Sequence, residues 1–389
     1  MLPHSLNLPL NEDERALADA LDRFIAGSLA PTIGTYVANH AFPEPILREF
    51  LSLGFMGAAF PDALGGAGLG LRGGGLVVER LAQCDPGFAA IVLCNSASMS
   101  VLSRFATPEQ QARWLVPLIK GEMLSSFGVS ETQGGSDPAS TRTSAAWTGT
   151  DWVLNGSKVF STNAGTALHG LSLVLAQTDP AAGTRGLSTF IVPAGTQGFT
   201  IAPPRKKIGW RVAPTVELYF DNVRLPSDHQ IGRPGDGLKQ VLVALAAGRI
   251  LVAACALGLT GKALAAASAY ARDRYLQGEP IISNQAVSFR LVDLGARYLA
   301  AALLTRHAAD LVDTGHAARA ETSAAKLLAS ELAVDAALTA VHLHGAYGIF
   351  YDQDVSGLIG EAKVLEIVEG VSEVQRLLMA REWFAEVPA

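Results

Sequence analysis

The stretch Ala362-Lys-Val-Leu-Glu-Ile-Val-Glu-Gly-Val-Ser-Glu-Val-Gln-Arg376 is the most informative in the chain, and it lies in a region expected to be helical. Its Glu369 stands between the apolar Val368 and Gly370, so the carboxylate has little polar company. Burial disfavours the charged form of a glutamate and raises its pKa from about 4.3 toward neutrality. A glutamate in such surroundings suits the role of a general base. The alternative is a solvated glutamate at a helix–loop junction.

Outward from this stretch, the hydrophobic period of the chain changes twice. Apolar residues at helical spacing predict an N-terminal helical domain over residues 1–121, with Asn11 capping its first helix. Alternation with a period of two predicts a small β-barrel or β-sandwich domain over residues 122–232. Long Ala/Leu-rich helices, one of them beginning near Leu238, predict a C-terminal four-helix bundle over residues 233–389. The fold class is therefore expected to be α+β in an α–β–α order.

Turn-forming residues predict individual turns and strands within these regions. Asn155-Gly156 separates two short strand-like segments, residues 152–154 and 158–160, and favours a tight hairpin there. The glycines between residues 65 and 75 predict turns. Further strands are expected at residues 171–176, 187–192 and 216–220.

The composition excludes several classes of protein. The chain has 389 residues, of which 49% are apolar, and its mean hydropathy is +0.27. The longest apolar run, Ile250 to Leu259, is about half of the roughly 20 residues that cross a bilayer, so no membrane span is expected. The N-terminus has no basic start followed by an apolar block, which favours a cytoplasmic location. A net charge of −6 argues against nucleic acid as a partner.

The cysteines point to no redox or metal chemistry. Cys84, Cys94 and Cys255 are isolated and fit neither a disulfide framework nor a metal site. They are expected to be small core residues, and no metal is predicted.

Five local sequences, in the same order along the chain, resemble motifs of the acyl-CoA dehydrogenase family. The first is Phe127-Gly-Val-Ser-Glu-Thr-Gln-Gly-Gly-Ser-Asp137, which is similar to the first signature of the family, although Thr and Gln stand where Pro and Gly are usual. The resemblance implies that Phe127, Val129 and Ser130 contact the flavin, and that Ser136 faces the flavin or the pantetheine. Read alone, the segment is a Gly-rich loop before a strand.

The second is Val159-Phe-Ser-Thr-Asn163, which resembles the W-I-T-N strand of the family. The resemblance implies that the ring of Phe160 packs against the flavin, and that the hydroxyl of Thr162 bonds the ring nitrogen that receives hydride. An ordinary strand with a buried Phe is the alternative.

The third is Ala246-Ala-Gly-Arg-Ile250, similar to a helical L-D-x-x-R segment. Some relatives keep the catalytic carboxylate immediately before this Arg, but here Gly248 occupies that position, so the base cannot be there. Ala246 replaces an Asp that commonly helps to hold coenzyme A, which leaves the thioester carrier open. Arg249 is expected at the substrate, unless it is merely solvated.

The fourth is Arg272-Asp-Arg-Tyr-Leu-Gln-Gly278 with a following Gln, similar to the R-x-x-F-G…Q turn, and His342-Leu-His-Gly-Ala346 stands where the family has Q-x-x-G-G. In the family this Arg reaches FAD phosphates across a subunit interface with a bidentate fork. The resemblance therefore implies a homodimer or homotetramer, and it assigns four residues to the cofactor: Arg274, Gln285, His342 and Gly345. For the histidine, a polar helix cap is the alternative.

The fifth is the stretch 362–376 itself, which resembles the second signature, A-K-x-x-x-I-Y-E-G-T-S-x-I-Q-R. The resemblance makes Glu369 the catalytic base, places Val368 and Gly370 at the substrate, and places Ser372 at the cofactor. Val368 stands where Tyr is usual and Val371 where Thr is usual.

Together the motifs imply FAD-dependent α,β-dehydrogenation of a saturated acyl thioester to the 2,3-enoyl thioester. Glu369 removes the proton next to the carbonyl while hydride leaves the β-carbon for FAD, and an electron-transferring flavoprotein is the expected electron acceptor. Three alternatives stay open. In the first, an acyl carrier protein carries the substrate in a biosynthetic pathway, and the acyl chain is deprotonated at the same position or further along. In the second, reduced flavin reacts with oxygen, as in an oxidase or monooxygenase. In the third, the protein is a non-catalytic scaffold that binds FAD.

Overall fold

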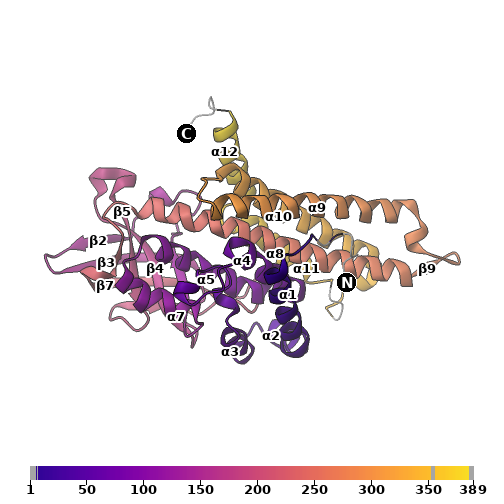
Figure 1. Cartoon of the computed structure of the whole chain (residues 1–389), viewed down its shortest axis with the longest axis horizontal. Coiled ribbons are helices and arrows are strands. Elements are labelled where there is room, and N and C mark those ends of the chain that lie inside the picture. Colours follow the sequence, from indigo (N-terminus) through magenta and orange to yellow (C-terminus); the bar gives the residue numbers. More distant parts are fainter. Residues whose placement is uncertain (1–5, 7, 352–354, 385–389) are drawn as a thin grey trace.

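The structure, a computed structural model, describes residues 6, 8–351 and 355–384 (Figure 1). Its N-terminal region is helical: α1 (Glu12–Phe24), α2 (Ile33–Asn39), α3 (Glu44–Ser52), α4 (Gly70–Cys84), α5 (Pro86–Phe105), α6 (Pro108–Gln110) and α7 (Val116–Ile119). Asn11 caps α1 as expected, because its side chain accepts from the N–H of Glu14 at 2.8 Å and the Glu14 carboxylate accepts from the N–H of Asn11 at 3.0 Å. This reciprocal pair fixes where the first helix starts.

A β region follows, with strands β1 (Leu124–Gly128), β2 (Ser144–Trp147), β3 (Asp151–Thr162), β4 (His169–Gln177), β5 (Leu187–Pro193), β6 (Phe199–Ile201), β7 (Thr215–Pro226) and β8 (Gln230–Ile231). They form one eight-stranded sheet in the order β6-β7-β3-β2-β4-β5-β8, and β1 pairs in parallel with β4. Alternate residues, such as Phe190 and Val192, fill an apolar core under the sheet. The three further strands expected from the sequence are present, and β7 is longer than expected.

The hairpin predicted at Asn155-Gly156 is wrong. These residues lie inside the single strand β3, where the pairing with β7 shifts by one residue between Leu154 and Gly156. Gly156 has φ +141°, and a Cβ there would lie 2.7 Å from the Cα of Thr143. Asn155 faces two residues of β7, Asp221 and Asn222, so a β-bulge in β7 lies here and β3 continues without a turn.

The C-terminal region returns to helix, with α8 (Gly237–Asp273), the small hairpin β9 (Tyr275–Leu276) and β10 (Glu279–Pro280), then α9 (Gln285–Asp313), α10 (Arg319–His344), α11 (Leu358–Ile367) and α12 (Ser372–Trp383). By length and composition, α5 and α8 resemble membrane spans, but 67% and 78% of their most apolar windows are buried inside the protein. They are core helices, and they explain the high hydropathy of the chain.

The Gly-rich segment is only partly a turn. Gly65 and Gly68 have positive φ, as turn residues do, but Gly73 and Gly74 belong to α4. A Cβ at Gly73 would lie 2.3 Å from the Cβ of Leu69, and one at Gly74 would lie 3.1 Å from the Cβ of Ala59. Close packing, and not turn formation, requires glycine at these two positions.

The N-terminal and C-terminal helices share one apolar core. Residues of α4 and α5, such as Val78 and Ile91, lie in the same cluster as Leu251 and Ala254 of α8. In Figure 1 the sheet lies at one end of the long axis and β9 at the other, and α8 runs between them. The fold is thus α+β, with a helical region, a β region and a helical bundle in that order, while the boundaries 121/122 and 232/233 stay predictions.

Candidate active site

The loop between α11 and α12 presents Glu369. α11 ends at Ile367 and α12 begins at Ser372, so four residues connect the two helices. Glu369 has φ +54° and Gly370 has φ +94°, two left-handed conformations in succession. A non-glycine residue in this region is strained, and such strain concentrates at functional sites. The turn aims the Glu369 side chain at α8.

Two buried side chains hold this turn. The Nε2 of Gln375 donates to the carbonyl oxygens of Glu369 and Gly370 at 3.0 and 2.8 Å. The Nζ of Lys326, on α10, donates to the carbonyls of Glu366 and Gly370 at 2.9 and 2.8 Å. Both Gln375 and Lys326 are fully buried, so they fix the backbone from which the carboxylate extends.

The carboxylate of Glu369 lies directly against Gly248 of α8. A Cβ built on Gly248 would lie 2.6 Å from Oε2 of Glu369, so no larger residue fits there without displacing the carboxylate. Burial raises the pKa of Glu369 to about 7, against the opposing charges of Arg249 and Lys326. A carboxylate that titrates near neutrality can accept a proton and release it again.

Arg249 is buried, with 5% of its surface exposed, so it is not the solvated helix-surface arginine that was the alternative. Its Nε has no hydrogen-bond partner among the described residues. Burial lowers the pKa of Arg249, and the negative charge of Glu369 opposes this shift. A half-buried Val368 borders the same turn. The arginine thus offers a buried, unused donor beside the base.

Cys94 also belongs to this site, which the sequence did not indicate. Burial and the charge of Glu369 raise the pKa of the Cys94 thiol to about 12, while a hydrogen bond with Thr162 opposes the shift. Cys94 of α5, Thr162 of β3 and Glu369 therefore converge. The thiol stays protonated at neutral pH, and thiols react as thiolates, so Cys94 forms a wall and is not a nucleophile.

The ring of Phe160 stands out from β3. Phe160 has φ +60° and lies where the pairing of β3 with β7 shifts between Lys158 and Ser161. This bulge turns the ring outward, and 74% of the residue is exposed. The alternative of an ordinary strand with a buried Phe is wrong. A large exposed ring on a strained backbone is a platform on which a flat ring system can stack.

The loop after β1 lies beside this platform. The N–H of Val159 donates to the carbonyl of Ser130 at 2.9 Å, and Lys158 donates to the carbonyl of Val129 at 3.1 Å. These bonds place Val129 and Ser130 next to Phe160, with Phe127 half-buried in β1. Ser136 lies further along the loop and is exposed.

A buried ion pair anchors the same loop. Lys158 contacts a carboxylate oxygen of Glu131 at 2.6 Å, and the carboxylate also accepts from the backbone N–H groups of Arg142 and Thr143. Glu131 and Lys158 are 6% and 0% exposed, so this anchor is shielded from water.

The remaining predicted cofactor residues lie elsewhere in the chain. Arg274 caps the far end of α8, and at 1.5 Å per residue it is roughly 37 Å along the helix from Arg249. The end of α10 lies close by, because the His344 ring stacks on Tyr270 of α8 with centroids 4.2 Å apart. This distant group is exposed, and it comprises Arg274, Gln285, His342 and Gly345.

Two of the residues expected at the flavin fit a bound FAD. Phe160 presents an exposed aromatic face, and the buried hydroxyl of Ser372, at the start of α12, has no hydrogen-bond partner among the described residues. A flavin would use both, since buried hydroxyls are normally paired. Among the same residues no group of three or more His, Cys, Asp or Glu is placed to hold a metal ion.

The sequence motifs singled out Glu369, Arg249, Phe160 and Thr162. The structure places Arg249 beside Glu369, and Thr162 beside the Cys94 that borders Glu369, whereas Phe160 lies two residues before Thr162 on β3. Three further residues were missed, namely Cys94, Lys326 and Gln375. Gln375 matches the Gln of the second signature, which was the available signal for it, but the sequence assigned it no role. A lysine on an otherwise Ala-rich helix was the available signal for Lys326, whereas Cys94 gave none.

Family models of acyl-CoA dehydrogenases match along the chain: the N-terminal domain at residues 11–122, the middle domain at residues 126–223 and the C-terminal domain at residues 235–384. An acyl-CoA dehydrogenase of Bacillus subtilis is 36% identical over 359 residues, which cover 92% of this chain and 94% of the relative.

Solved structures of acyl-CoA dehydrogenases and related enzymes are also similar to this chain. Butyryl-CoA dehydrogenase from Megasphaera elsdenii superposes with a TM-score of 0.94 at 32% identity, covering 97% of this chain and 99% of that one. A glutaryl-CoA dehydrogenase from Mycobacterium smegmatis in complex with FADH2 has a TM-score of 0.91 at 29% identity, covering 97% and 96%. The prolyl acyl carrier protein oxidase AnaB has a TM-score of 0.92 at 27% identity, covering 97% and 100%.

Proposed function

Since the chain belongs to the acyl-CoA dehydrogenase family, whose members are FAD oxidoreductases acting on CH–CH groups, we propose that it converts a saturated acyl thioester to its 2,3-enoyl thioester with Glu369 as the base. The observation that carries this proposal is the Glu369 carboxylate, aimed at α8 with a pKa of about 7. A pKa near neutrality suits removal of a weakly acidic proton from carbon.

The protein's own residues position the reactants. Glu369 takes the proton next to the thioester carbonyl, and the buried Arg249 steadies the carboxylate. Gln375 and Lys326 keep the turn in its strained form, so the base stays at a fixed place relative to Phe160 and Thr162. FAD, when bound, accepts the hydride that leaves the β-carbon. Phe160 gives the flavin a face to pack on, while Ser372, Val129 and Ser130 supply polar and backbone contacts.

The identity of the base is tested by Glu369→Gln in the FAD-loaded protein. Glu373→Gln is the matched control, because Glu373 is exposed on the next helix, four residues away. We expect Glu369→Gln to keep its yellow colour but to lose anaerobic bleaching by substrate, whereas Glu373→Gln bleaches like the wild type. Normal bleaching of Glu369→Gln would exclude it as the base.

The carrier of the acyl chain is a second question, and coenzyme A is the first proposal. Ala246 and Val368 depart from the usual family pattern, and the similarity to a prolyl acyl carrier protein oxidase supports a carrier-protein substrate as the second candidate. Bleaching by acyl-CoA supports the first, and bleaching only by acyl carrier protein supports the second. We propose an electron-transferring flavoprotein as acceptor. Stoichiometric hydrogen peroxide from the reduced protein in air, at the rate of turnover, would favour an oxidase instead.

The distant group at Arg274 supports a homo-oligomer. Arg274 lies roughly 37 Å along α8 from Arg249, too far for one FAD to contact both in one chain, so we propose that a second copy supplies Arg274, Gln285, His342 and Gly345. A guanidinium fork suits a pyrophosphate. The test is complementation between two inactive variants, Glu369→Gln and Arg274→Gln. If the site is shared, co-expressed chains form one intact site per mixed pair and regain activity. If each chain holds its own FAD, the mixture stays inactive.

A further inference from the structure

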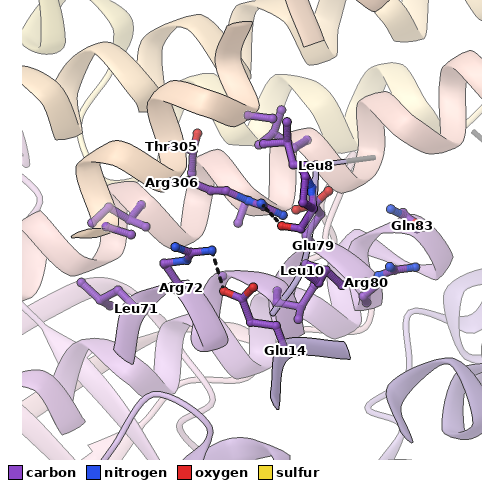
Figure 2. A pocket seen from close by; sticks show the side chains of 18 of the residues that line it. Leu8, Leu10, Glu14, Leu71, Arg72, Glu79, Arg80, Gln83, Thr305 and Arg306 are labelled. Atoms are coloured by element: carbon purple, nitrogen blue, oxygen red, sulfur yellow. Dashed lines mark hydrogen bonds and ion pairs between the residues drawn. The ribbon is translucent and has the colours of Figure 1, made fainter. Parts of the chain in front are cut away.

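A cavity of about 530 Å³ lies away from the candidate active site, between the N-terminal segment and helices α1, α4, α8 and α9 (Figure 2). Its volume is in the range of small-molecule pockets. It touches α8 at Ile250, Ala254 and Leu257, whereas Gly248 of the same helix lies against Glu369. None of the residues assigned to the flavin or to the base lines it.

Most of the cavity wall is apolar. Leu8 and Leu10 cover one side, Leu76 comes from α4, and Ile250 and Ala302 come from α8 and α9. Residues 8–10 are held in place by Arg306, which donates to the carbonyl of Pro9 at 2.7 Å. An aliphatic chain in this space would be removed from water on several sides, which favours its binding.

The polar groups gather at one place. Figure 2 shows Arg306 reaching from α9 toward Glu79 of α4, and the hydroxyl of Tyr298 donates to a Glu79 carboxylate oxygen at 2.9 Å. Arg72, at the edge, already pairs with Glu14 at 2.8 Å.

Arg306 differs from the neighbouring arginines because it has no carboxylate partner among the described residues. Arg80 also has a carboxylate partner, Asp22, at 3.3 Å, whereas Arg306 makes no ion pair within the described part of the chain. Its guanidinium has five donors, so donors remain beyond the bond to Pro9.

We propose that this cavity binds a medium-chain aliphatic carboxylate as a non-reacting ligand, with its carboxylate on Arg306 and its chain between Leu8, Leu10 and the apolar face of α8. A planar guanidinium suits a carboxylate, and charge-assisted bonds of this kind are among the strong ones. Burial raises the pKa of Glu79, which reduces the negative charge that the ligand meets. The ligand would pack against α8 next to Arg249, so it would also stabilise the helix against which the Glu369 carboxylate packs.

The test is calorimetric titration of the FAD-loaded protein with octanoate. Arg306→Gln, at a half-buried position, should weaken octanoate binding at least about tenfold, because it removes a charged hydrogen bond. The matched Arg306→Lys should lose less, since it keeps the charge. Ala302→Phe, which fills the cavity from α9, should abolish octanoate binding while substrate bleaching continues. Octanoate binding that is unchanged in both Arg306→Gln and Ala302→Phe would overturn the proposal.

Two further measurements test whether the ligand needs a carboxylate and whether it binds in this cavity. The neutral 1-octanol should bind the wild type at least about tenfold more weakly than octanoate, and equal affinity would overturn the assignment of a carboxylate ligand. Glu369→Gln should bind octanoate like the wild type, and loss of binding there would place octanoate in the active site instead. Because neither readout is turnover, this proposal can fail while the dehydrogenase function stands, and the reverse also holds.

Discussion

The carboxylate of Glu369 and the Cα of Gly248 face each other across the contact between α8 and the turn that precedes α12. A Cβ on Gly248 would lie 2.6 Å from Oε2 and 2.8 Å from Cδ of Glu369. The motif resemblance implies that some relatives carry the base at the position of Gly248, and here the two positions compete for the same space. Only one of the two positions can place a side chain at this contact, and in this chain it is Glu369.

Gly248→Ala should therefore lower the activity without lowering the stability of the fold. Alanine is favoured over glycine inside a helix by about 1 kcal/mol, so the fold should not weaken from propensity. The new methyl group must push the carboxylate aside, and a displacement of about 1 Å can lower a rate by roughly 100-fold. We expect FAD to stay bound and the rate of bleaching to fall by at least tenfold.

The control for this variant is Gly295→Ala in α9. There a Cβ would lie 3.6 Å from the nearest atom, a side-chain carbon of Leu6, which is an ordinary contact. Gly295→Ala should bleach at the rate of the wild type. Equal rates for both alanine variants would show that the contact at Gly248 does not position the base.

The pH dependence follows from the pKa of Glu369, which burial raises from 4.5 to about 7. The base must be ionised, so the single-turnover rate should rise about tenfold per pH unit below pH 7 and level off above it. In stability the sign is opposite. The folded state binds more protons than the unfolded state between pH 4.5 and 7, so the free energy of unfolding contributed by Glu369 falls as the pH rises through this window.

Glu369→Gln removes this slope. At pH 8 the free energy of unfolding of the variant should exceed that of the wild type by up to about 3 kcal/mol. The difference should vanish near pH 4.5. Stopped-flow flavin absorbance gives the rate profile, and urea denaturation at both pH values gives the stability. A rate that stays flat from pH 5 to pH 8 would contradict the raised pKa of the base.

Lys326 should act as a positioning residue. Its charge opposes the rise in the pKa of Glu369, and its Nζ holds two carbonyls of the turn. Lys326→Met loses both roles, so the acidic limb of the rate profile should move to higher pH and the plateau should fall. Lys326→Arg keeps the charge and should keep the position of the limb even where the plateau drops. A purely structural lysine would change the plateau and leave the limb in place in both variants.

Most of the fold was predictable because the chain signals it locally. Asn11 has the Glu14 that completes a capping box, and α8 and α10 are Ala/Leu-rich over their whole lengths. The failures came where a local signal has two solutions. Asn155-Gly156 permits either a tight turn or a strand that continues opposite a bulge, and the partner strand β7, more than 50 residues away, selects the continuous strand. Gly73 and Gly74 permit either a turn or close helix packing.

Some residues of the candidate site were also signalled by local sequence, and others were not. Glu369 and Phe160 were singled out because their local motifs are specific, but the strained backbones of both residues depend on contacts with distant residues. Lys326 and Cys94 reach the site through tertiary packing alone, from helices whose sequences give no sign of Glu369. Such convergence cannot be read from spacing along one chain.

Phe160 combines the aromatic side chain that we propose for the flavin with a backbone conformation that glycine would prefer. A bulky residue with φ near +60° costs roughly 1–2 kcal/mol relative to glycine. Phe160→Gly should therefore raise the unfolding temperature of the apoprotein and weaken FAD binding. Phe160→Ala removes the ring but keeps the strain, so it should weaken FAD equally without the gain in stability. Fluorescence titration with FAD and calorimetric melting separate the two effects. If apo Phe160→Gly is no more stable than apo Phe160→Ala, the backbone at this position is not strained.

The pair of Glu131 and Lys158 gives the last prediction. The hydrogen bond and charge of Lys158 lower the pKa of Glu131 to about 2 although burial opposes this, so the contribution of Glu131 to stability is present above pH 4.5 and is lost as the pH falls through 2. Lys158→Met leaves the carboxylate buried without its cation, which should cost about 3–5 kcal/mol in free energy of unfolding. The double variant Lys158→Met with Glu131→Gln has no unpaired charge, so it should recover part of that loss while FAD binding by the loop after β1 stays weakened. Urea denaturation of the two variants decides this, because a single variant as stable as the wild type would mean that the pair does not anchor the loop.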